Sequence, residues 1–345
     1  MSVAVAGVSY AALVDRLGAE CPDSPRRIVS LPDGSVDHCY RVTGPGGARL
    51  ESRAALGRHL LEDGETFPLE HLEVRPGGQA VNASRQIHAL GDDAALVGHL
   101  DHSVLADLPF ETHSMGPPAT IHVLAFDGEE CLFPERTDRF AQWGVDDLLA
   151  AIDWADLVDA DALCCGNWVS FHGLSEVFDR LAARSVDCPL VLDPGAIGLA
   201  EYAAITDLFD ALAAADDSLE VALSVSQSEY EAAAEVVGVS GDDPTATLSA
   251  LRSALEISAV VFHGTDEAIA ATRTGPTRVE TPDVDDPQLT VGAGDRFSGG
   301  LACALARDWP WEDALALGNA CASHFVATGE TGDRSALASF VREQG

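Results

Sequence analysis

Short apolar stretches alternate with amphipathic stretches along most of this chain, and this alternation constrains the fold more than any other feature. The apolar stretches have the length of strands, and the segments between them carry apolar residues at helical spacing. Such alternation predicts an α/β fold with a doubly wound, mostly parallel sheet flanked by helices. The candidate strands are residues 28–31, 94–100, 162–165, 190–193, 221–225 and 259–263. The clearest candidate helices are residues 81–90, 174–183, 229–237 and 247–255.

Two segments depart from the alternation and predict a small β subdomain inserted into the α/β core. Residues 120–133 have the pattern of a β-hairpin, and the Asp127-Gly128 pair favours a type I′ turn. Residues 38–75 are rich in glycine and charge. Residues 44–47 of that segment predict a turn between two short extended pieces.

The 20 basic residues are all arginine, because the sequence contains no lysine. A Schiff-base enzyme needs a lysine amine, and a Walker-A phosphate loop needs a lysine next to its serine or threonine. This one absence therefore excludes two large classes of active site.

The formal net charge is −36, from 56 acidic and 20 basic residues. Such a surface repels phosphate backbones and anionic lipid, so we expect no nucleic-acid partner and no membrane partner. A halophilic cytosol explains the charge better than an ordinary one, because concentrated salt screens self-repulsion over a Debye length of about 3 Å at 1 M. An acidic protein of an ordinary cytosol is the alternative.

The eight cysteines are scattered without a C-x-x-C spacing and are expected to be buried thiols. Residues 1–10 lack the basic region of a signal peptide, and no uncharged run approaches the roughly 18 residues that a membrane span needs. These features predict a protein of the reducing cytoplasm.

The most informative motif occupies residues 290–300 and reads T-V-G-A-G-D-R-F-S-G-G. Its Gly292-Ala293-Gly294 turn opens a helix, so backbone N–H groups are exposed at the positive end of the helix dipole, where an anion can bind. Asp295 follows directly, and its carboxylate can accept a proton from a hydroxyl that attacks a phosphate. The alternative is that Asp295 only caps the helix.

A second glycine-rich element occurs at residues 76–84 and reads P-G-G-Q-A-V-N-A-S. Gly77 and Gly78 open another helix, and Asn82 follows four residues after Gly78. The amide of Asn82 can donate and accept hydrogen bonds, as sugar hydroxyls require. This element favours the catalytic interpretation of Asp295 over the structural one.

The two elements, in this order, resemble the two signatures of the ribokinase-like (PfkB) carbohydrate kinase family, and the resemblance covers roughly residues 28–330. It implies an α/β sandwich with a β lid over the sugar site, ATP bound near the C-terminal portion, and Mg²⁺ bridging the phosphates. The predicted kinase domain spans residues 28–342, with lid segments at about 38–75 and 114–137 and a partly helical N-terminal extension over 1–27.

The resemblance also assigns roles to individual residues. The catalytic residues it implies are Asp295, as the base, and Gly292, Ala293 and Gly294, as the anion hole. The implied sugar-binding residues are Asp37, Gly77, Gly78 and Asn82. Asn167 joins them because it follows the carboxyl end of a strand, where ligands bind in open α/β sheets. The implied nucleotide-binding residues are Ser228, Glu231, His263, Gly264, Thr290 and Asn319, and Glu231 would hold Mg²⁺ through water.

The sequence departs from the family pattern at several positions. Ser228 stands where the family's Asn-x-x-Glu motif has asparagine, so metal coordination is expected to be rearranged. Leu289 stands where many members have an aspartate of a monovalent-cation site, so we do not predict potassium activation by that route. Pro32 stands where the first strand usually has glycine. Arg296 could contact phosphate, but exposure in the first helical turn is the favoured interpretation.

Other candidates are weaker. Residues 99–102 lack a carboxylate cluster for a metal and are expected to form a polar loop beside the substrate cleft. Cys164 and Cys165 should point to opposite faces of a strand and so cannot readily form a disulfide. Trp168 is expected to line the pocket or to belong to the core, and Asp193, at a strand end, is a weak site candidate.

The sequence therefore predicts an ATP-dependent phosphotransferase that moves the γ-phosphoryl group to a hydroxyl of a sugar or sugar derivative, with Asp295 as the general base. A nucleoside kinase of the same fold and a non-catalytic sugar-binding relative are the alternatives. An oxidoreductase is excluded because Phe297 stands where a dinucleotide fingerprint needs its third glycine. Since members of the family often pair through their lids, a homodimer is a further expectation.

Overall fold

A nine-stranded sheet forms the centre of the molecule in this computed structural model, which describes residues 6–18, 24–62, 66–184 and 186–344. The strands from β11 to β5 are parallel to their neighbours, and β12 and β13 add an antiparallel edge. The spatial order is β13 (Gly275–Glu280), β12 (Glu267–Thr272), β11 (Ala259–His263), β10 (Glu220–Val225), β9 (Pro189–Asp193), β8 (Ala162–Gly166), β1 (Arg27–Leu31), β4 (Asp93–Gly98) and β5 (Glu111–Ser114). The predicted doubly wound sheet is confirmed.

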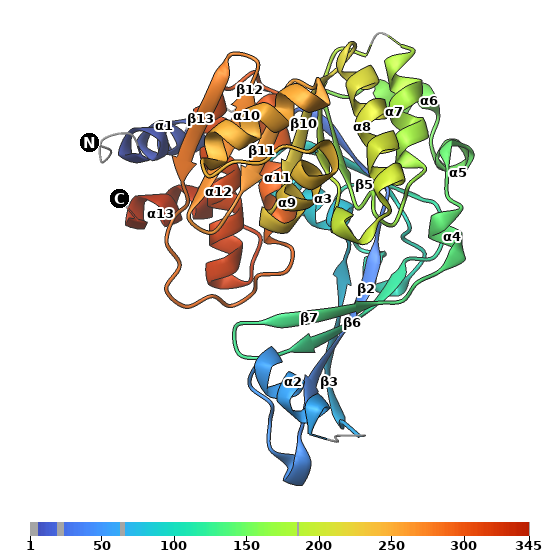
Figure 1. The fold of residues 1–345 in the computed structure, drawn as a ribbon, viewed down its shortest axis with the longest axis vertical. Coiled ribbons are helices and arrows are strands. Elements are labelled where there is room, and N and C mark those ends of the chain that lie inside the picture. The colour runs from blue at the N-terminus through green and yellow to red at the C-terminus, as the bar shows by residue number, and fades with distance from the viewer. Residues whose placement is uncertain (1–5, 19–23, 63–65, 185, 345) are drawn as a thin grey trace.

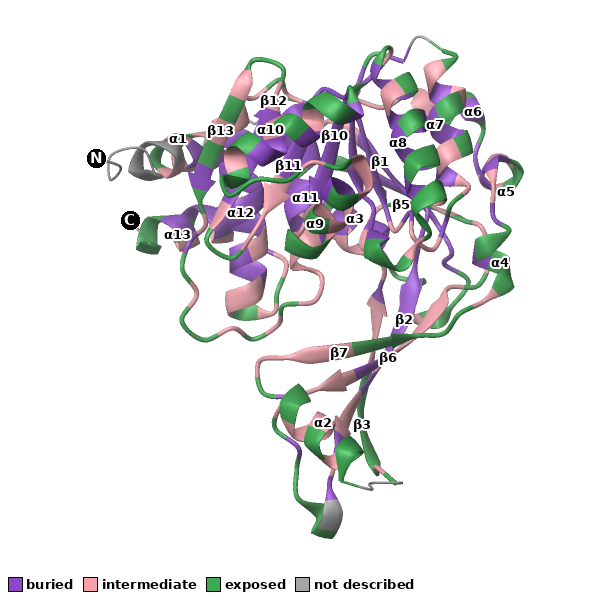
Figure 2. Cartoon of the chain, viewed as in Figure 1, coloured by how far each residue is buried: buried purple, intermediate pink, exposed green. Residues whose placement is uncertain are grey.

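Both faces of the sheet are buried, because consecutive strand residues point into two different cores. Val29 packs in one core and its neighbour Ile28 in the other. The helices of the first layer are α4 (Asp138–Ala141), α5 (Val145–Ala151), α6 (Trp154–Val158), α7 (Leu174–Ala182), α8 (Tyr202–Asp216), α9 (Gln227–Val237) and α10 (Pro244–Leu255). Those of the second are α1 (Ala6–Gly18), α3 (Gln79–Ala89), α11 (Ala293–Leu305), α12 (Trp311–Thr328) and α13 (Arg334–Gln344). Figure 2 shows the buried residues concentrated in this body.

Helix α11 packs closely between α3 and α12, because a glycine faces each neighbour. A Cβ at Gly299 would lie 2.8 Å from the carbonyl oxygen of Ala83 on α3. A Cβ at Gly300 would lie 2.9 Å from Sγ of Cys321 on α12. Both distances are shorter than a side chain tolerates, so the two glycines fix the position of the helix that carries the second glycine motif.

A separate four-stranded sheet projects from the body, as Figure 1 shows, and we call it the lid. Its strand order is β3 (Leu69–Gly77), β2 (Ser35–Val42), β6 (Ala119–Ala125) and β7 (Glu130–Pro134). The β6–β7 hairpin reaches back to the body, since a Cβ at Gly128 would lie 3.4 Å from the carbonyl oxygen of Pro287. The predicted β subdomain is confirmed.

Part of the lid differs from the prediction. Helix α2 (Arg53–Leu61) follows a 3₁₀ turn, η1 (Pro45–Gly47), in a segment that was expected to be a glycine turn between extended pieces. Ser52 caps α2 by accepting a 3.1 Å hydrogen bond from the Ala55 amide. None of the helix residues is buried, so α2 has no apolar stripe for a periodicity argument to detect.

The type I′ turn predicted for the hairpin is wrong. That turn needs a positive φ at both central residues. Gly128 has φ 71°, but among the described non-glycine residues positive φ occurs only at Asn167, Glu256 and Asp308, so Asp127 keeps an ordinary backbone conformation.

The N-terminal helix α1 packs against the second helical layer. Leu13 and Leu17 are buried there. Arg16 donates a 2.9 Å hydrogen bond to Asp313 at the start of α12, and its guanidinium lies 4.7 Å from the centre of the Trp309 ring. In the described ranges, no helix combines the length and the hydropathy that crossing a membrane requires.

The described cysteines are all free, and all but Cys131 are buried. Cys165 lies in the first core and Cys164 in the second, so the two side chains point to opposite faces of β8, as expected. Cys21 lies outside the described residues.

Candidate active site

The second glycine motif forms a tight turn directly before α11. Gly292 is the N-terminal capping residue of the helix and has φ 91°, a left-handed conformation that favours glycine. The Ala293 amide donates to the Thr290 carbonyl at 3.3 Å, and the first turn of the helix then contains Gly294 and Asp295. The backbone amides at the start of this helix lie at the positive end of its dipole, within three residues of the Asp295 carboxylate, so an anion and a proton acceptor can meet here.

Asp295 is buried, and Asn82 from the first glycine motif holds its carboxylate. Asn82 Nδ2 donates a 2.8 Å hydrogen bond to Oδ2 of Asp295. Burial raises the pKa of Asp295, while the Asn82 hydrogen bond and the adjacent Arg296 charge lower it. The result is a carboxylate that binds a proton more readily than one exposed to solvent.

Arg296 is buried rather than exposed, which corrects the prediction for this residue. Its guanidinium folds back on the glycine turn and donates to the Gly292 carbonyl at 2.8 Å and to Thr331 Oγ1 at 3.2 Å. It also lies 3.5 Å from the centre of the Phe325 ring. Burial lowers the pKa of Arg296 to about 10. Arg296 therefore holds the turn through the carbonyl of Gly292.

The first glycine motif lies against Asp37 at the base of the lid. Asp37 is buried and accepts a 2.7 Å hydrogen bond from Ser35 Oγ. A Cβ at Gly77 would lie 2.4 Å from a carboxylate oxygen of Asp37, and Gly78 has φ 107° and packs against Gly34. Both positions need glycine, because a side chain would displace Asp37 or the backbone beside it.

Asp33 is a central residue of this region that the sequence did not reveal. It accepts hydrogen bonds from the backbone amides of Gln79, at 3.1 Å, and Ala80, at 2.8 Å, which are the first amides of α3. Asn167 Nδ2 donates to the same carboxylate at 2.8 Å, from a backbone with φ 54°. Burial raises the pKa of Asp33 to about 6, and the three hydrogen bonds oppose that rise. Asp33 thus joins Asn167 to the start of α3.

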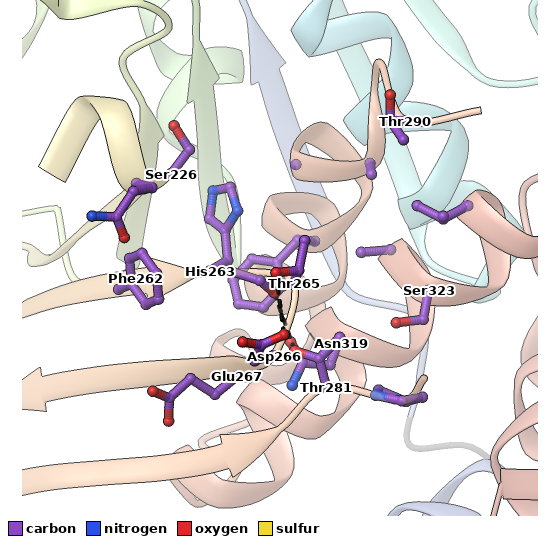
Figure 3. A pocket seen from close by; sticks show the side chains of 18 of the residues that line it. Ser226, Phe262, His263, Thr265, Asp266, Glu267, Thr281, Thr290, Asn319 and Ser323 are labelled. Atoms are coloured by element: carbon purple, nitrogen blue, oxygen red, sulfur yellow. Dashed lines mark hydrogen bonds between the residues drawn. The ribbon is translucent and has the colours of Figure 1, made fainter. Parts of the chain in front are cut away.

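A cavity of about 860 Å³ opens on the other side of the α11 turn. Figure 3 shows His263, Thr290 and Asn319 around it. Gly264, Ala293 and Gly294 also line it, so most residues expected to bind nucleotide are brought together here. Nε2 of His263 is buried and has no hydrogen-bond partner in the described chain. Burial lowers the pKa of His263 to about 4, so the ring is neutral near pH 7.

Ser228 and Glu231 do not reach this cavity, which corrects the expected register of the Asn-x-x-Glu motif. Both are exposed on α9, and Glu231 accepts a hydrogen bond from Gln227 at 2.6 Å. Ser226 lines the cavity instead and caps α9, and Glu229 accepts from its amide at 2.8 Å and from its hydroxyl at 2.7 Å. Glu229 is therefore the glutamate that faces the site.

Three carboxylates, those of Asp193, Glu229 and Asp295, affect one another's protonation. Burial raises the pKa of each, and the charge of Asp295 raises that of the other two. Asp193 also accepts hydrogen bonds from Gln79 Nε2 at 2.9 Å and from the Gly195 amide at 3.1 Å. Among the described residues, no three His, Cys, Asp or Glu side chains are close enough to hold a metal ion by themselves. A cation here would take most of its ligands from water or from a bound substrate.

Two other candidates belong to the core. His99 is buried between the rings of Phe140 and Phe171, and its Nδ1 lies 3.2 Å from the Pro32 carbonyl oxygen. The expected polar loop beside the cleft is therefore wrong for His99. Trp168 is also buried and donates from Nε1 to Ser175 Oγ at 3.1 Å, which favours the core alternative.

Comparisons with known proteins agree with this architecture. The family model described as prokaryotic ketohexokinase matches residues 62–344. A ketohexokinase of Haloferax volcanii is 29% identical over 308 residues, which cover 85% of this chain and 79% of that protein. A 5-dehydro-2-deoxygluconokinase of Geobacillus kaustophilus is 38% identical over 74 residues, or 21% of this chain and 22% of that protein.

Solved structures show the same fold at low identity. The ribokinase of Thermotoga maritima superimposes with a TM-score of 0.68 and 17% identity, over 92% of this chain and 99% of that one. A fructokinase of Xylella fastidiosa with bound ATP gives 0.62 and 17%, over 92% and 98%. A nucleoside kinase of Burkholderia thailandensis in complex with inosine gives 0.65 and 16%, over 92% and 98%. At this identity the likeness establishes the fold and leaves the acceptor open.

Proposed function

The chain belongs to the prokaryotic ketohexokinase family, within the ribokinase-like (PfkB) carbohydrate kinases, and we propose that it transfers the γ-phosphoryl group of ATP to a hydroxyl of a ketohexose such as D-fructose. One observation carries this proposal. Asp295 lies between the 860 Å³ cavity and the polar group around Asp37 and Asn82, and Asn82 orients its carboxylate at 2.8 Å. A base at that junction can reach a hydroxyl on one side and a phosphate on the other.

In this mechanism Asp295 removes the proton of the attacking hydroxyl. The burial that raises its pKa makes it a better proton acceptor than a solvated carboxylate, and the hydrogen bond from Asn82 opposes that rise by favouring the ionised form. The amides of Gly292 and Gly294 would stabilise the negative charge on the transferred group, while the Ala293 amide is bonded to the Thr290 carbonyl and Arg296 bonds the Gly292 carbonyl. No lysine is needed for this arrangement.

The site also fits a divalent cation beside the phosphates. Asp193 is buried and Glu229 partly buried near Asp295, and their mutual repulsion would be relieved by a positive charge between them and the nucleotide. Mg²⁺ held there, through water on the protein side, would neutralise charge on the phosphates. Glu229, not Glu231, is the residue that we propose for this role.

The proposal is tested by ADP release from Mg-ATP with D-fructose in molar KCl, with sugar acids and nucleosides as other acceptors. We expect fructose-dependent release that falls at least about 10²–10³-fold in Asp295→Asn, while the melting temperature stays within a few degrees. The matched control is Asp210→Asn, an exposed carboxylate on α8, which should retain full activity. Undiminished turnover in the Asp295 variant would refute the base, and a preference for nucleosides would refute the acceptor.

We further propose that the protein works in a salt-rich cytoplasm, and that two copies pair through their lids. The net charge of −36 supports the first proposal, since salt at high concentration screens the self-repulsion. The second is supported by large apolar side chains exposed on lid elements. These are Leu60, Leu61, Leu69, Leu72, Leu132 and Phe133.

A further inference from the structure

An ion pair crosses the lid next to the residues that we propose bind the sugar. Arg75 lies on β3 and Glu130 on β7, the two opposite edges of the four-stranded sheet. Arg75 Nη2 lies 2.9 Å from Oε1 and 3.1 Å from Oε2 of Glu130. The Glu130 side chain is only 5% exposed and that of Arg75 is 23% exposed, so solvent screens this pair poorly.

The pair also contacts the acceptor side of the active site. Arg75 is the cross-strand neighbour of Asp37, and its Nε lies 3.8 Å from Asp37 Oδ2. The Arg75 guanidinium therefore lies beside two carboxylates, those of Glu130 and Asp37. The three side chains together carry one net negative charge when all of them are ionised. Asp295, Glu73, His38 and Arg296 are further charged or titratable groups near enough to influence it.

We propose that Glu130 sets the charge preference of the acceptor site, by occupying Arg75 so that the site accepts neutral sugars and rejects sugar acids. The inference rests on the proposed sugar kinase function. A planar guanidinium with free donors binds a carboxylate with two parallel hydrogen bonds, which makes an unoccupied arginine beside a sugar site a natural acid receptor. Glu130 already engages Nη2 of Arg75 with both of its oxygens, and the charges of Glu130 and Asp37 together outweigh that of the guanidinium, so an incoming acid meets a group of net negative charge.

The burial of Glu130 agrees with such a role. Burial raises the pKa of Glu130, and the charge of Arg75 opposes that rise. Removing the charge of Glu130 leaves Arg75 with Asp37 alone, at 3.8 Å, so Nη2 loses its hydrogen-bonded partner and an anionic ligand can replace it. The other ion pairs of the lid hairpin do not share this geometry. Glu129, the adjacent residue, pairs with Arg53 and is 40% exposed.

The test compares wild type, Glu130→Gln and Glu129→Gln with D-fructose and with 2-keto-D-gluconate, a keto sugar that carries a carboxylate. The readouts are kcat/KM from ADP release and the dissociation constant of each sugar from calorimetry. We expect Glu130→Gln to raise the acid-to-fructose ratio at least tenfold in both readouts, through tighter binding of the acid. Glu129→Gln should leave the ratio unchanged, and the double variant Arg75→Gln/Glu130→Gln should lose the gain.

An unchanged ratio in a folded Glu130→Gln protein overturns the inference, and so does a gain that persists without Arg75. If Glu130→Gln does not fold, Glu130→Asp takes its place, because it keeps the charge and lengthens the contact with Arg75. Glu130→Asp should shift the acid-to-fructose ratio in the same direction by a smaller factor. An unchanged ratio in Glu130→Asp would overturn the inference. Failure of wild type to phosphorylate fructose would instead refute the proposed function. The calorimetric comparison of the two sugars remains valid in that case.

Discussion

Asn82 donates a 2.8 Å hydrogen bond from its side-chain amide to Asp295, a residue 213 positions later in the chain. This contact joins the two glycine motifs into one site. Asn82 lies in the first turn of α3 and Asp295 in the first turn of α11, and the close packing of these helices sets the distance between them. The proposed base is thus oriented by the motif that also borders Asp37.

The first prediction concerns this hydrogen bond. Replacing Asn82 with leucine removes a donor that favours the ionised form of Asp295, so the pKa of Asp295 should rise further. Because the base must be ionised to act, the acid limb of the kcat/KM profile should move to higher pH, and activity near neutral pH should fall about tenfold or more. The measurement is the pH profile of ADP release. His88→Gln, on the exposed side of α3, is the control, and an unmoved acid limb would contradict the role of Asn82.

The second prediction separates two glutamates on one helix. Glu229→Gln should lower kcat/KM for Mg-ATP at least about tenfold and raise the Mg²⁺ concentration needed for half-maximal rate, because it removes a partly buried negative charge that interacts with Asp295. Glutamine still serves as the partner of the Ser226 cap, so α9 should remain folded. Glu231→Gln should change either value less than twofold. A titration with Mg²⁺ distinguishes the two variants, and the reverse result would restore the register expected from sequence.

The third prediction concerns stability and pH. The folded-state pKa of Asp33 is raised from 3.8 to about 6, so the folded protein binds this proton more tightly than the unfolded chain. The stability that this proton contributes is fully present below about pH 4 and is lost as the pH rises through about 6. The free energy of unfolding should therefore fall by up to about 3 kcal/mol across that window, at about 1.4 kcal/mol per pKa unit.

Denaturant unfolding at about pH 4.5 and about pH 7 in molar KCl measures this effect, with salt screening the surface charge. The Asp33→Asn variant should lose less stability between the two pH values than wild type does. Asp210→Asn should behave like wild type. If Asp33→Asn loses as much free energy of unfolding between the two pH values as wild type does, the pH dependence arises from the other buried carboxylates.

Much of the fold follows from the sequence, because each buried strand produces an apolar run with a turn after it. The residue at which α9 begins does not follow from the sequence. Ser226 and Ser228 are each followed three residues later by a glutamate, Glu229 and Glu231, so the same S-x-x-E capping pattern occurs twice. Only the end of β10 at Val225 selects the first pair, and a strand boundary cannot be placed within two residues from pattern alone.

The errors at buried polar side chains have one physical cause, which is that burial of such side chains depends on distant partners. Arg296 is buried because Phe325 and Thr331 cover it from other segments. Asp33 caps a helix that begins 46 positions later. His99 packs on aromatic rings from α4 and from the loop before α7. Neither composition nor spacing near these residues records such contacts.

Gly299 and Gly300, which allow α11 to pack closely between α3 and α12, make substitutions in this part of the body less tolerable than substitutions in the lid. A larger residue at Gly299 or Gly300 would displace α11, and with it the proposed base Asp295, so we expect these two positions to tolerate no side chain. The lid sheet has no such constraint along most of its length, since it touches the body mainly at its root and at one hairpin tip. Substitutions in the lid can therefore alter which acceptor is bound without displacing α11 and the proposed phosphoryl-transfer site.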